Sequence, residues 1–353
     1  SCPSLLLEPQ RTNVVTHSEY FEASDWNKNS STVLSNQITS PENTNNASKL
    51  SDKTTFNRHS LWRNYTTSST NNTISIFAKK GTKKHFSIYT SDTTTWNTML
   101  VVDLEAGTIT KEYNKIGFTS INTIESYANG WYRIVAAISG TQSGNALYTR
   151  FAIQDEAEPA NPPDNKYTGD GTGNVYIYGA QVELGASYAT SYIPTFGATV
   201  TRVIDGCTKT GVSGLIGQTE GTIFMDANYK ADNGEDQTII INEPGFNDYV
   251  FIQMNSSNTL EAGIIVNTNQ IARIGQTKTS GRYKCAFAYK DNDFAFYVNG
   301  VQIGTDTSGS MSGFTVANIN FNHNNKGYSI HDTLLFKTRL SNTQLAELTS
   351  IDS

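Results

Sequence analysis

Short segments in which apolar and polar residues alternate recur along almost the whole chain. In one of them, Ile74, Ile76 and Ala78 alternate with Thr73 and Ser75. Because successive side chains of a β-strand point to opposite faces of a sheet, this period of two predicts strands with one buried face. The predicted strands are residues 73–79, 85–90, 98–104, 130–138, 146–153 and 175–182 in the first half, and 221–227, 237–242, 248–254, 259–266, 270–274, 282–289, 293–298 and 328–337 in the second.

Helical periodicity is confined to residues 341–348 at the C-terminus. Ser341 is a suitable N-cap, and Leu345 and Leu348 are spaced to share one face. Elsewhere, strands follow one another at regular spacing, which predicts an all-β fold. A chain of 353 residues is long enough for two domains. We therefore predict two tandem antiparallel β-sandwich domains of jelly-roll type with one short C-terminal helix.

The boundary between the two domains is predicted where glycines interrupt the strand pattern. The first pattern ends near Pro194, and Gly206, Gly211, Gly214 and Gly217 punctuate the segment that follows. The predicted organisation is a sandwich of residues 1–200, a linker of residues 201–219 and a sandwich of residues 220–353.

Composition and charge exclude several classes of partner. Only 16% of the residues are charged and the net charge is −6, so the chain lacks the concentrated basic face that nucleic acids require. No stretch approaches the roughly 20 apolar residues that cross a bilayer, so we expect no membrane insertion. Ser1 is not an initiator Met and no signal peptide follows it, so we expect the chain to be a piece of a longer protein.

The three cysteines, Cys2, Cys207 and Cys285, are odd in number and far apart. This spacing is typical neither of a disulfide framework nor of a metal-binding pair. Cys285 is predicted to be a small hydrophobic residue within a strand. A pairing of Cys2 with Cys207 remains an open, less favoured alternative.

Two segments bracket the first half of the chain. One reads LLLEPQRTN at residues 5–13 and continues to Trp26, and the other reads VYIYGAQVELG at residues 175–185 and continues through TSYIPT to Thr195. The pair resembles segments of phage tail-fibre and related virion proteins, in which it opens and closes a β-sandwich similar to carbohydrate-binding modules. The resemblance implies a surface-recognition protein exposed on the tail or fibre of a virion.

Residues 220–350 resemble the concanavalin A-like, laminin-G-like sandwich. The resemblance rests on the opening strand 221–227, on a hairpin at residues 293–304 and on a closing strand at residues 329–336 that precedes the short helix. Within the hairpin, Asn299 and Gly300 form a two-residue turn that tolerates positive φ. This fold hosts lectins, enzymes and structural modules, so the resemblance implies a fold and leaves the function open.

Aromatic side chains are the first candidates for sugar binding, because a flat ring stacks on the C–H face of a pyranose. The chain has 18 Tyr, 16 Phe and 4 Trp, and all four Trp lie in the first half. Trp26 and Trp131 are predicted to be structural. For Trp62 and Trp96, which lie in polar surroundings, ligand stacking and packing beneath a loop are about equally favoured. The candidate glycan-binding residues are Trp62, Tyr65, Trp96, Asn322, His323 and Asn324.

No cofactor is certain, but a structural calcium is a candidate, because sandwich carbohydrate modules often hold one with carboxylates. Its candidate ligands are Glu19, Glu22 and Asp170. The resembling modules often carry acidic residues in the closing strand, where this chain has Tyr178-Gly179-Ala180, and this departure weakens the case. The basic segment from Lys79 to Lys84 is predicted to be a solvated hairpin.

No pattern of catalytic residues stands out. A glycoside hydrolase of this fold would need paired carboxylates on alternate strand positions, and none is found. The five His are scattered and none belongs to a known motif. We therefore expect that the chain is not an enzyme.

These observations predict a virion tail or fibre protein that binds host cell-surface polysaccharide and contacts other virion proteins. The resemblance implies a homo-oligomer, usually a trimer. One alternative is a structural decoration or adaptor module that binds protein. Others are a polysaccharide depolymerase and a carbohydrate-binding fragment of a secreted or cell-surface bacterial protein.

Overall fold

A computed structural model describes residues 4–91, 96–141, 143–156, 166–229, 236–322 and 327–351, and of Trp96 it describes the backbone alone. The chain divides into two compact units. We call Arg11–Arg202 the first sandwich, and Ser1–Gln10 together with Val203–Ser353 the second sandwich. Among the described residues, no helix has the length and apolar character needed to span a membrane.

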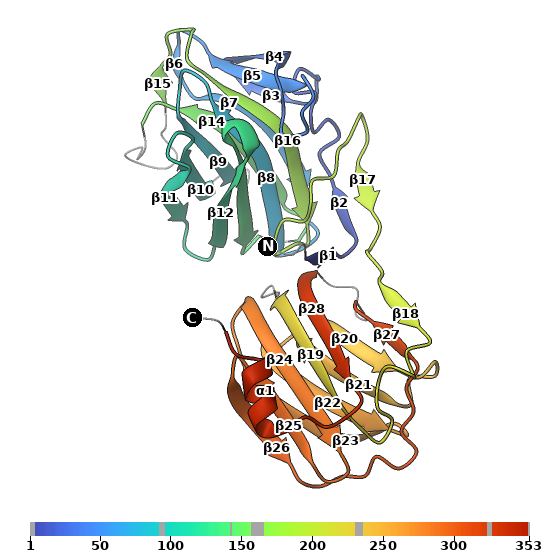
Figure 1. Cartoon of the computed structure of the whole chain (residues 1–353). Helices are drawn as coiled ribbons and strands as arrows, with labels where there is room; N and C mark the ends of the chain where they lie inside the picture. The colour runs from blue at the N-terminus through green and yellow to red at the C-terminus, as the bar shows by residue number, and fades with distance from the viewer. Residues whose placement is uncertain are drawn as a thin grey trace. The chain divides into compact units, whose positions relative to one another are not determined.

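The first sandwich contains two six-stranded antiparallel sheets in its described part (Figure 1). Strands far apart in sequence are neighbours in both sheets, as expected for a jelly roll. One sheet has the order β12 (Thr119–Tyr127), β13 (Trp131–Ser139), β8 (Asn71–Lys80), β16 (Asn174–Leu184), β5 (Ala47–Asp52) and β4 (Ser31–Ile38); the other has the order β11 (Thr108–Asn114), β10 (Trp96–Asp103), β9 (His85–Ser91), β14 (Ala146–Gln154), β7 (His59–Thr66) and β3 (Asn27–Asn29).

Smaller elements complete the first sandwich. They are a short helix, η1 (Ala128–Gly130), and two two-stranded ladders, one of β2 (Arg11–Asn13) with β17 (Val200–Arg202) and one of β6 (Phe56–Asn57) with β15 (Tyr167–Thr168).

The alternation in β8 places its residues as predicted. Ile74, Ile76 and Ala78 are buried in the core between the two sheets. Phe77 points to the opposite face and packs in a separate cluster with Trp131 and Tyr178. The strand is therefore buried on both faces, because aromatic residues cover its outer side.

The second sandwich also contains two six-stranded antiparallel sheets in its described part (Figure 1). One sheet has the order β1 (Leu5–Leu7), β28 (Tyr328–Phe336), β19 (Glu220–Tyr229), β24 (Gly281–Lys290), β25 (Phe294–Val298) and β26 (Val301–Asp306); the other has the order β18 (Thr208–Thr210), β27 (Asn318–Asn320), β20 (Gln237–Asn242), β21 (Tyr249–Met254), β22 (Thr259–Val266) and β23 (Asn269–Thr277).

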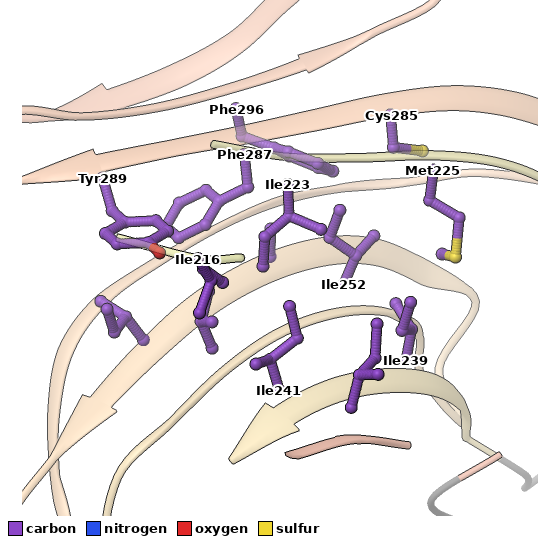
Figure 2. Close-up of a cluster of buried hydrophobic side chains, with 14 of the residues drawn as sticks. Ile216, Ile223, Met225, Ile239, Ile241, Ile252, Cys285, Phe287, Tyr289 and Phe296 are labelled. Atoms are coloured by element: carbon purple, nitrogen blue, oxygen red, sulfur yellow. The ribbon is translucent and has the colours of Figure 1, made fainter. Parts of the chain in front are cut away.

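The core of the second sandwich consists of alternate residues from both sheets. Figure 2 shows Ile223 and Phe287 from one sheet pointing toward Ile241 and Ile252 from the other. Cys285 lies in the same cluster and is fully buried, so its prediction as a small hydrophobic residue is confirmed. On β20–β23, the residues that alternate with the core residues therefore point to the outer face of the sheet.

The helix α1 (Asn342–Leu348) lies across β24 and β25, on the outer face of the sheet that contains these two strands (Figure 1). Ser341 caps it, since its side chain accepts a hydrogen bond from the Gln344 N–H and the Gln344 side chain bonds back to the Ser341 N–H. The predictions of an all-β fold and one short C-terminal helix are confirmed.

The predicted boundaries differ from those observed in two places. Leu5–Leu7, assigned by its sequence to the start of the first domain, pairs with Ile330, Ser329 and Tyr328 in the second sandwich. The predicted linker is partly built into sheets, because Val200–Arg202 pairs with β2 and Thr208–Thr210 pairs with β27.

Candidate functional site

The two bracketing segments are joined by Asn13, whose side chain is fully buried. Its Nδ2 donates to the carbonyl oxygens of Ala180 (3.2 Å) and Ile193 (2.9 Å). Its Oδ1 accepts from the N–H groups of Val15 and Val182, each at 3.1 Å. Because one buried amide satisfies four backbone groups, these segments act mainly as framework at this point.

Trp26 and Trp131 are structural, as predicted. Both are almost completely buried. The indole N–H of Trp26 donates to the carbonyl oxygen of His17 at 2.8 Å, and that of Trp131 donates to the carbonyl oxygen of Thr39 at 3.0 Å. Neither ring is free to stack on a ligand.

Trp62 and Tyr65 lie on β7 but point to opposite faces of its sheet. Trp62 is half-buried on the outer face, with its ring 5.7 Å from the Tyr148 ring and 5.9 Å from the Arg150 guanidinium. Tyr65 packs against the inner core, and burial raises the pKa of its hydroxyl. The two residues therefore cannot form one site, and the side chain of Trp96 lies outside the described part of the chain.

The three candidates near residue 322 are only partly described. Asn322 is buried, and its Nδ2 donates to the carbonyl oxygen of Asp205 at 2.8 Å. Its backbone N–H donates to Oδ1 of Asn320 at 2.9 Å. Asn322 thus stabilises its own turn, while His323 and Asn324 lie outside the described residues.

The candidate calcium ligands each bond to nearby donors. Glu19 accepts from Tyr192 and Asn46, each at 3.1 Å, and Glu22 accepts from the Ser35 N–H at 2.6 Å. Oδ1 of Asp170 accepts from the N–H and hydroxyl of Thr172 and from the N–H of Gly173. Within the described ranges, no three His, Cys, Asp or Glu side chains are placed to hold a metal ion, and the structural calcium stays a prediction.

A groove of about 380 Å³ lies on the outer face of β20–β23 and was not predicted. The register brings its residues side by side: Ile240 is opposite Phe251, Phe251 is opposite Gly263, and Gly263 is opposite Arg273. The groove is lined by Thr238, Ile240, Phe246, Tyr249, Phe251, Gln253, Ile265 and Arg273.

Aromatic side chains form much of the groove. The Phe251 ring lies over Gly263, where an added Cβ would come within 2.7 Å of the ring, so the strand position beneath the ring requires glycine. The Tyr249 ring is 6.1 Å from the Phe251 ring and inclined at 45°. Phe246, in the loop before β21, is 41% exposed. Phe251 itself is buried, so the apolar surface that is open to solvent comes from Phe246 and the partly exposed Tyr249.

A network of polar side chains includes Thr238, Gln253 and Arg273, which line the groove, and continues beneath it. The Glu261 carboxylate is buried and accepts from Arg273 Nε (2.9 Å), Gln253 Nε2 (2.6 Å) and Asn255 Nδ2 (2.9 Å). Burial alone would raise the pKa of Glu261, but these bonds and the Arg273 charge hold that pKa below its ordinary value. The Thr238 hydroxyl donates to Oε1 of Gln253 at 3.1 Å, which extends the network.

The sequence carries a signal for this site in the alternation of aromatic and polar residues along one strand. Tyr249, Phe251 and Gln253 alternate along β21, with Glu261 and Arg273 on the next two strands. Their shared face follows from the period of two, but their alignment across strands depends on the register.

Comparisons with known proteins give no relative by sequence, since no family model and no curated protein matches the chain. Solved structures match part of it. A sialidase carbohydrate-binding module of Ruminococcus gnavus bound to α2,3-sialyllactose is 14% identical, covering 42% of this chain and 97% of its own, with a TM-score of 0.34. A carbohydrate-binding module of Bacillus subtilis is 10% identical, with 39% and 86% covered and a TM-score of 0.27. A galectin of Caenorhabditis elegans is 11% identical, with 37% and 89% covered and a TM-score of 0.27.

Proposed function

We propose that the chain is a non-catalytic glycan-binding protein whose groove on β20–β23 holds the sugar. The observation that carries the proposal is that one groove of about 380 Å³ combines the exposed Phe246 and partly exposed Tyr249 rings with Arg273, whose guanidinium is held by the buried Glu261 carboxylate. A pyranose has an apolar C–H face and an edge of hydroxyls. The rings suit the first, and the fixed donors and acceptors suit the second.

The charge balance favours an uncharged sugar. Arg273 is the cationic side chain that lines the groove, and its Nε and Nη2 are both bonded to the Glu261 carboxylate. The remaining guanidinium N–H groups can donate to hydroxyl oxygens, while the net charge of the pair is zero. The volume lies near the lower end of the ~300–1,000 Å³ typical of small-ligand sites, which suits a short segment of a glycan.

The setting we propose is the exposed surface of a phage tail or fibre, in line with the resemblance of the bracketing segments. The partner would be a host cell-surface polysaccharide, and the chain would assemble as a homo-oligomer, such as a trimer, with other virion proteins. A shallow groove binds each glycan weakly, and several linked copies raise the overall avidity by about 10²–10⁴. Immunogold labelling of phage particles with antibodies against the chain tests this part, and particles that remain unlabelled would overturn it.

A glycan array followed by calorimetric titration of the full chain tests the binding itself. We expect a neutral oligosaccharide to bind, and Tyr249→Ala to weaken it about tenfold through loss of ring contact. Phe56→Ala is the matched control, because Phe56 is a 70% exposed ring outside the groove and its loss should change nothing.

Tryptophan fluorescence separates the groove from the surface around Trp62. All four Trp lie in the first sandwich, at positions 26, 62, 96 and 131. Binding in the groove should leave the emission unchanged. An emission change that disappears in Trp62→Phe, together with full affinity in Tyr249→Ala, would assign the sugar to Trp62 and overturn the proposed site.

A further inference from the structure

A second pocket, of about 360 Å³, lies in the first sandwich where the two bracketing segments meet. Glu19 and Tyr20 come from the first segment, and Phe196 directly follows the second. A β-bridge between His17 and Phe196 holds the two sides together. The pocket therefore belongs to the framework that Asn13 also stabilises.

Two aromatic rings at this pocket are exposed. Phe196 is 78% exposed and Tyr20 is 51% exposed. Single exposed apolar residues are common on protein surfaces, but two rings beside one concavity form a surface on which a flat ligand can stack.

A carboxylate without a cationic partner lines the same pocket. Glu19 accepts hydrogen bonds from the uncharged Tyr192 hydroxyl and Asn46 amide. In the part of the chain that the structure describes, no lysine or arginine forms an ion pair with it. Burial raises the pKa of Glu19, as expected for a charge that lacks a counter-ion.

The side chains of Arg63 and His17 are bonded to a different carboxylate, that of Asp25. Nη1 of Arg63 lies 2.7 Å from Oδ2 of Asp25, and Nδ1 of His17 lies 2.9 Å from the same oxygen. Asp25 therefore holds both groups, and Glu19 remains available to a cation from outside.

Two further oxygen atoms of the pocket residues are unsatisfied. Oγ of Ser35 and Oδ1 of Asn46 are buried and have no hydrogen-bond partner among the described residues. Both atoms are closed to solvent, so the charged acceptor that the pocket offers to a ligand is the Glu19 carboxylate. An ammonium group carries three N–H donors.

We infer that this pocket binds an amino sugar with a free ammonium group, whose ring stacks against Tyr20 or Phe196 while the ammonium pairs with Glu19. The volume of about 360 Å³ and the two exposed rings favour a sugar ring over the thin aliphatic chain of a lysine. The inference shares with the proposed function only the class of ligand, and it stands even if the groove on β20–β23 binds nothing.

Calorimetric titration of the full chain with a glucosamine tetramer tests the inference, beside its fully N-acetylated counterpart, which lacks the charge. We expect the glucosamine tetramer to bind at least tenfold more tightly than the acetylated one. Glu19→Gln, which keeps the shape and removes the charge, should lower the affinity about tenfold. Phe196→Ala should also weaken binding. Because Phe196 is exposed and lies outside the core, this second variant tests the pocket even if Glu19→Gln disturbs folding.

Phe56→Ala serves as the matched control, because it removes a 70% exposed ring that lines neither pocket and should leave binding of the glucosamine tetramer unchanged. Equal affinity for the two tetramers, no binding of either, or full affinity in both Glu19→Gln and Phe196→Ala would overturn the inference. Nα-acetyl-lysine amide is the last probe: binding as tight as that of the glucosamine tetramer would overturn the sugar assignment, and much weaker binding supports it.

Discussion

Arg273 binds the Glu261 carboxylate with both arms of its guanidinium: Nε is 2.9 Å from Oε2, and Nη2 is 2.5 Å from Oε1. The two residues come from neighbouring strands, β23 and β22, and Arg273 lines the groove. The Arg273 guanidinium is also 5.7 Å from the centre of the Phe251 ring. One cation thus connects the polar network to the Phe251 ring.

Glu261→Gln should change which sugars the groove accepts. The variant keeps the shape of the side chain but leaves Arg273 with an unbalanced positive charge. We expect the affinity for the neutral glycan to fall about tenfold. The affinity for a uronic-acid oligosaccharide should rise relative to that for the neutral glycan, as measured by calorimetric titration with each ligand.

Asp226→Asn is the matched control for that change. It removes the charge from another two-armed ion pair, with Arg282, on the other sheet of the same sandwich. Its selectivity should match that of the parent chain. A Glu261→Gln variant with unchanged selectivity would contradict the assigned role of the pair.

Asn13→Ala should destabilise the first sandwich strongly. The change leaves two buried N–H groups and two buried carbonyl groups without their partner. Each unsatisfied group costs about 1–3 kcal/mol, so we expect a loss of at least ~3 kcal/mol in the free energy of unfolding after relaxation. Chemical denaturation measures it. The exposed Asn27→Ala serves as control, and an equally small effect of both changes would contradict this role.

Asp103 should contribute to stability in mildly acidic solution. Burial would raise the pKa of its carboxyl, but hydrogen bonds from the Ala106 and Glu105 N–H groups and from Lys84 lower it from 3.8 to about 2. Since the folded pKa is the lower one, this stability is present above about pH 4 and is lost as the pH falls toward 2. Asp103→Asn should be less stable at pH 7 and should lose less stability on acidification. Denaturation curves at pH 2, 4 and 7 test this, and parallel curves for the two proteins would contradict it.

The sequence predicts features whose cause is local. Thr259–Val266 forms a strand with the bounds that its alternation indicated. Asn299 and Gly300 adopt φ of 50° and 79°, as the two-residue turn between β25 and β26 requires. Such features depend on a few neighbouring residues, so they can be found without knowing the rest of the fold.

Features that depend on distant pairing could not be found in the same way. Nothing within Leu5–Leu7 specifies that it pairs with Tyr328–Ile330, more than 300 positions away. The groove has the same origin, because Phe251 meets Arg273 only through the register of three strands across Gly263. The sequence prediction rested on Trp62 and Trp96 in the first sandwich, whereas the groove is lined by Tyr and Phe.

Chemical-shift mapping tests the central claim most directly. Backbone amide resonances of the labelled full chain would be followed while the neutral oligosaccharide selected on the array is added. The account predicts that the largest shifts fall on β21, β22 and β23, at Tyr249, Phe251, Gln253, Glu261 and Arg273. Largest shifts on β7 and β14, around Trp62 and Tyr148, would contradict it.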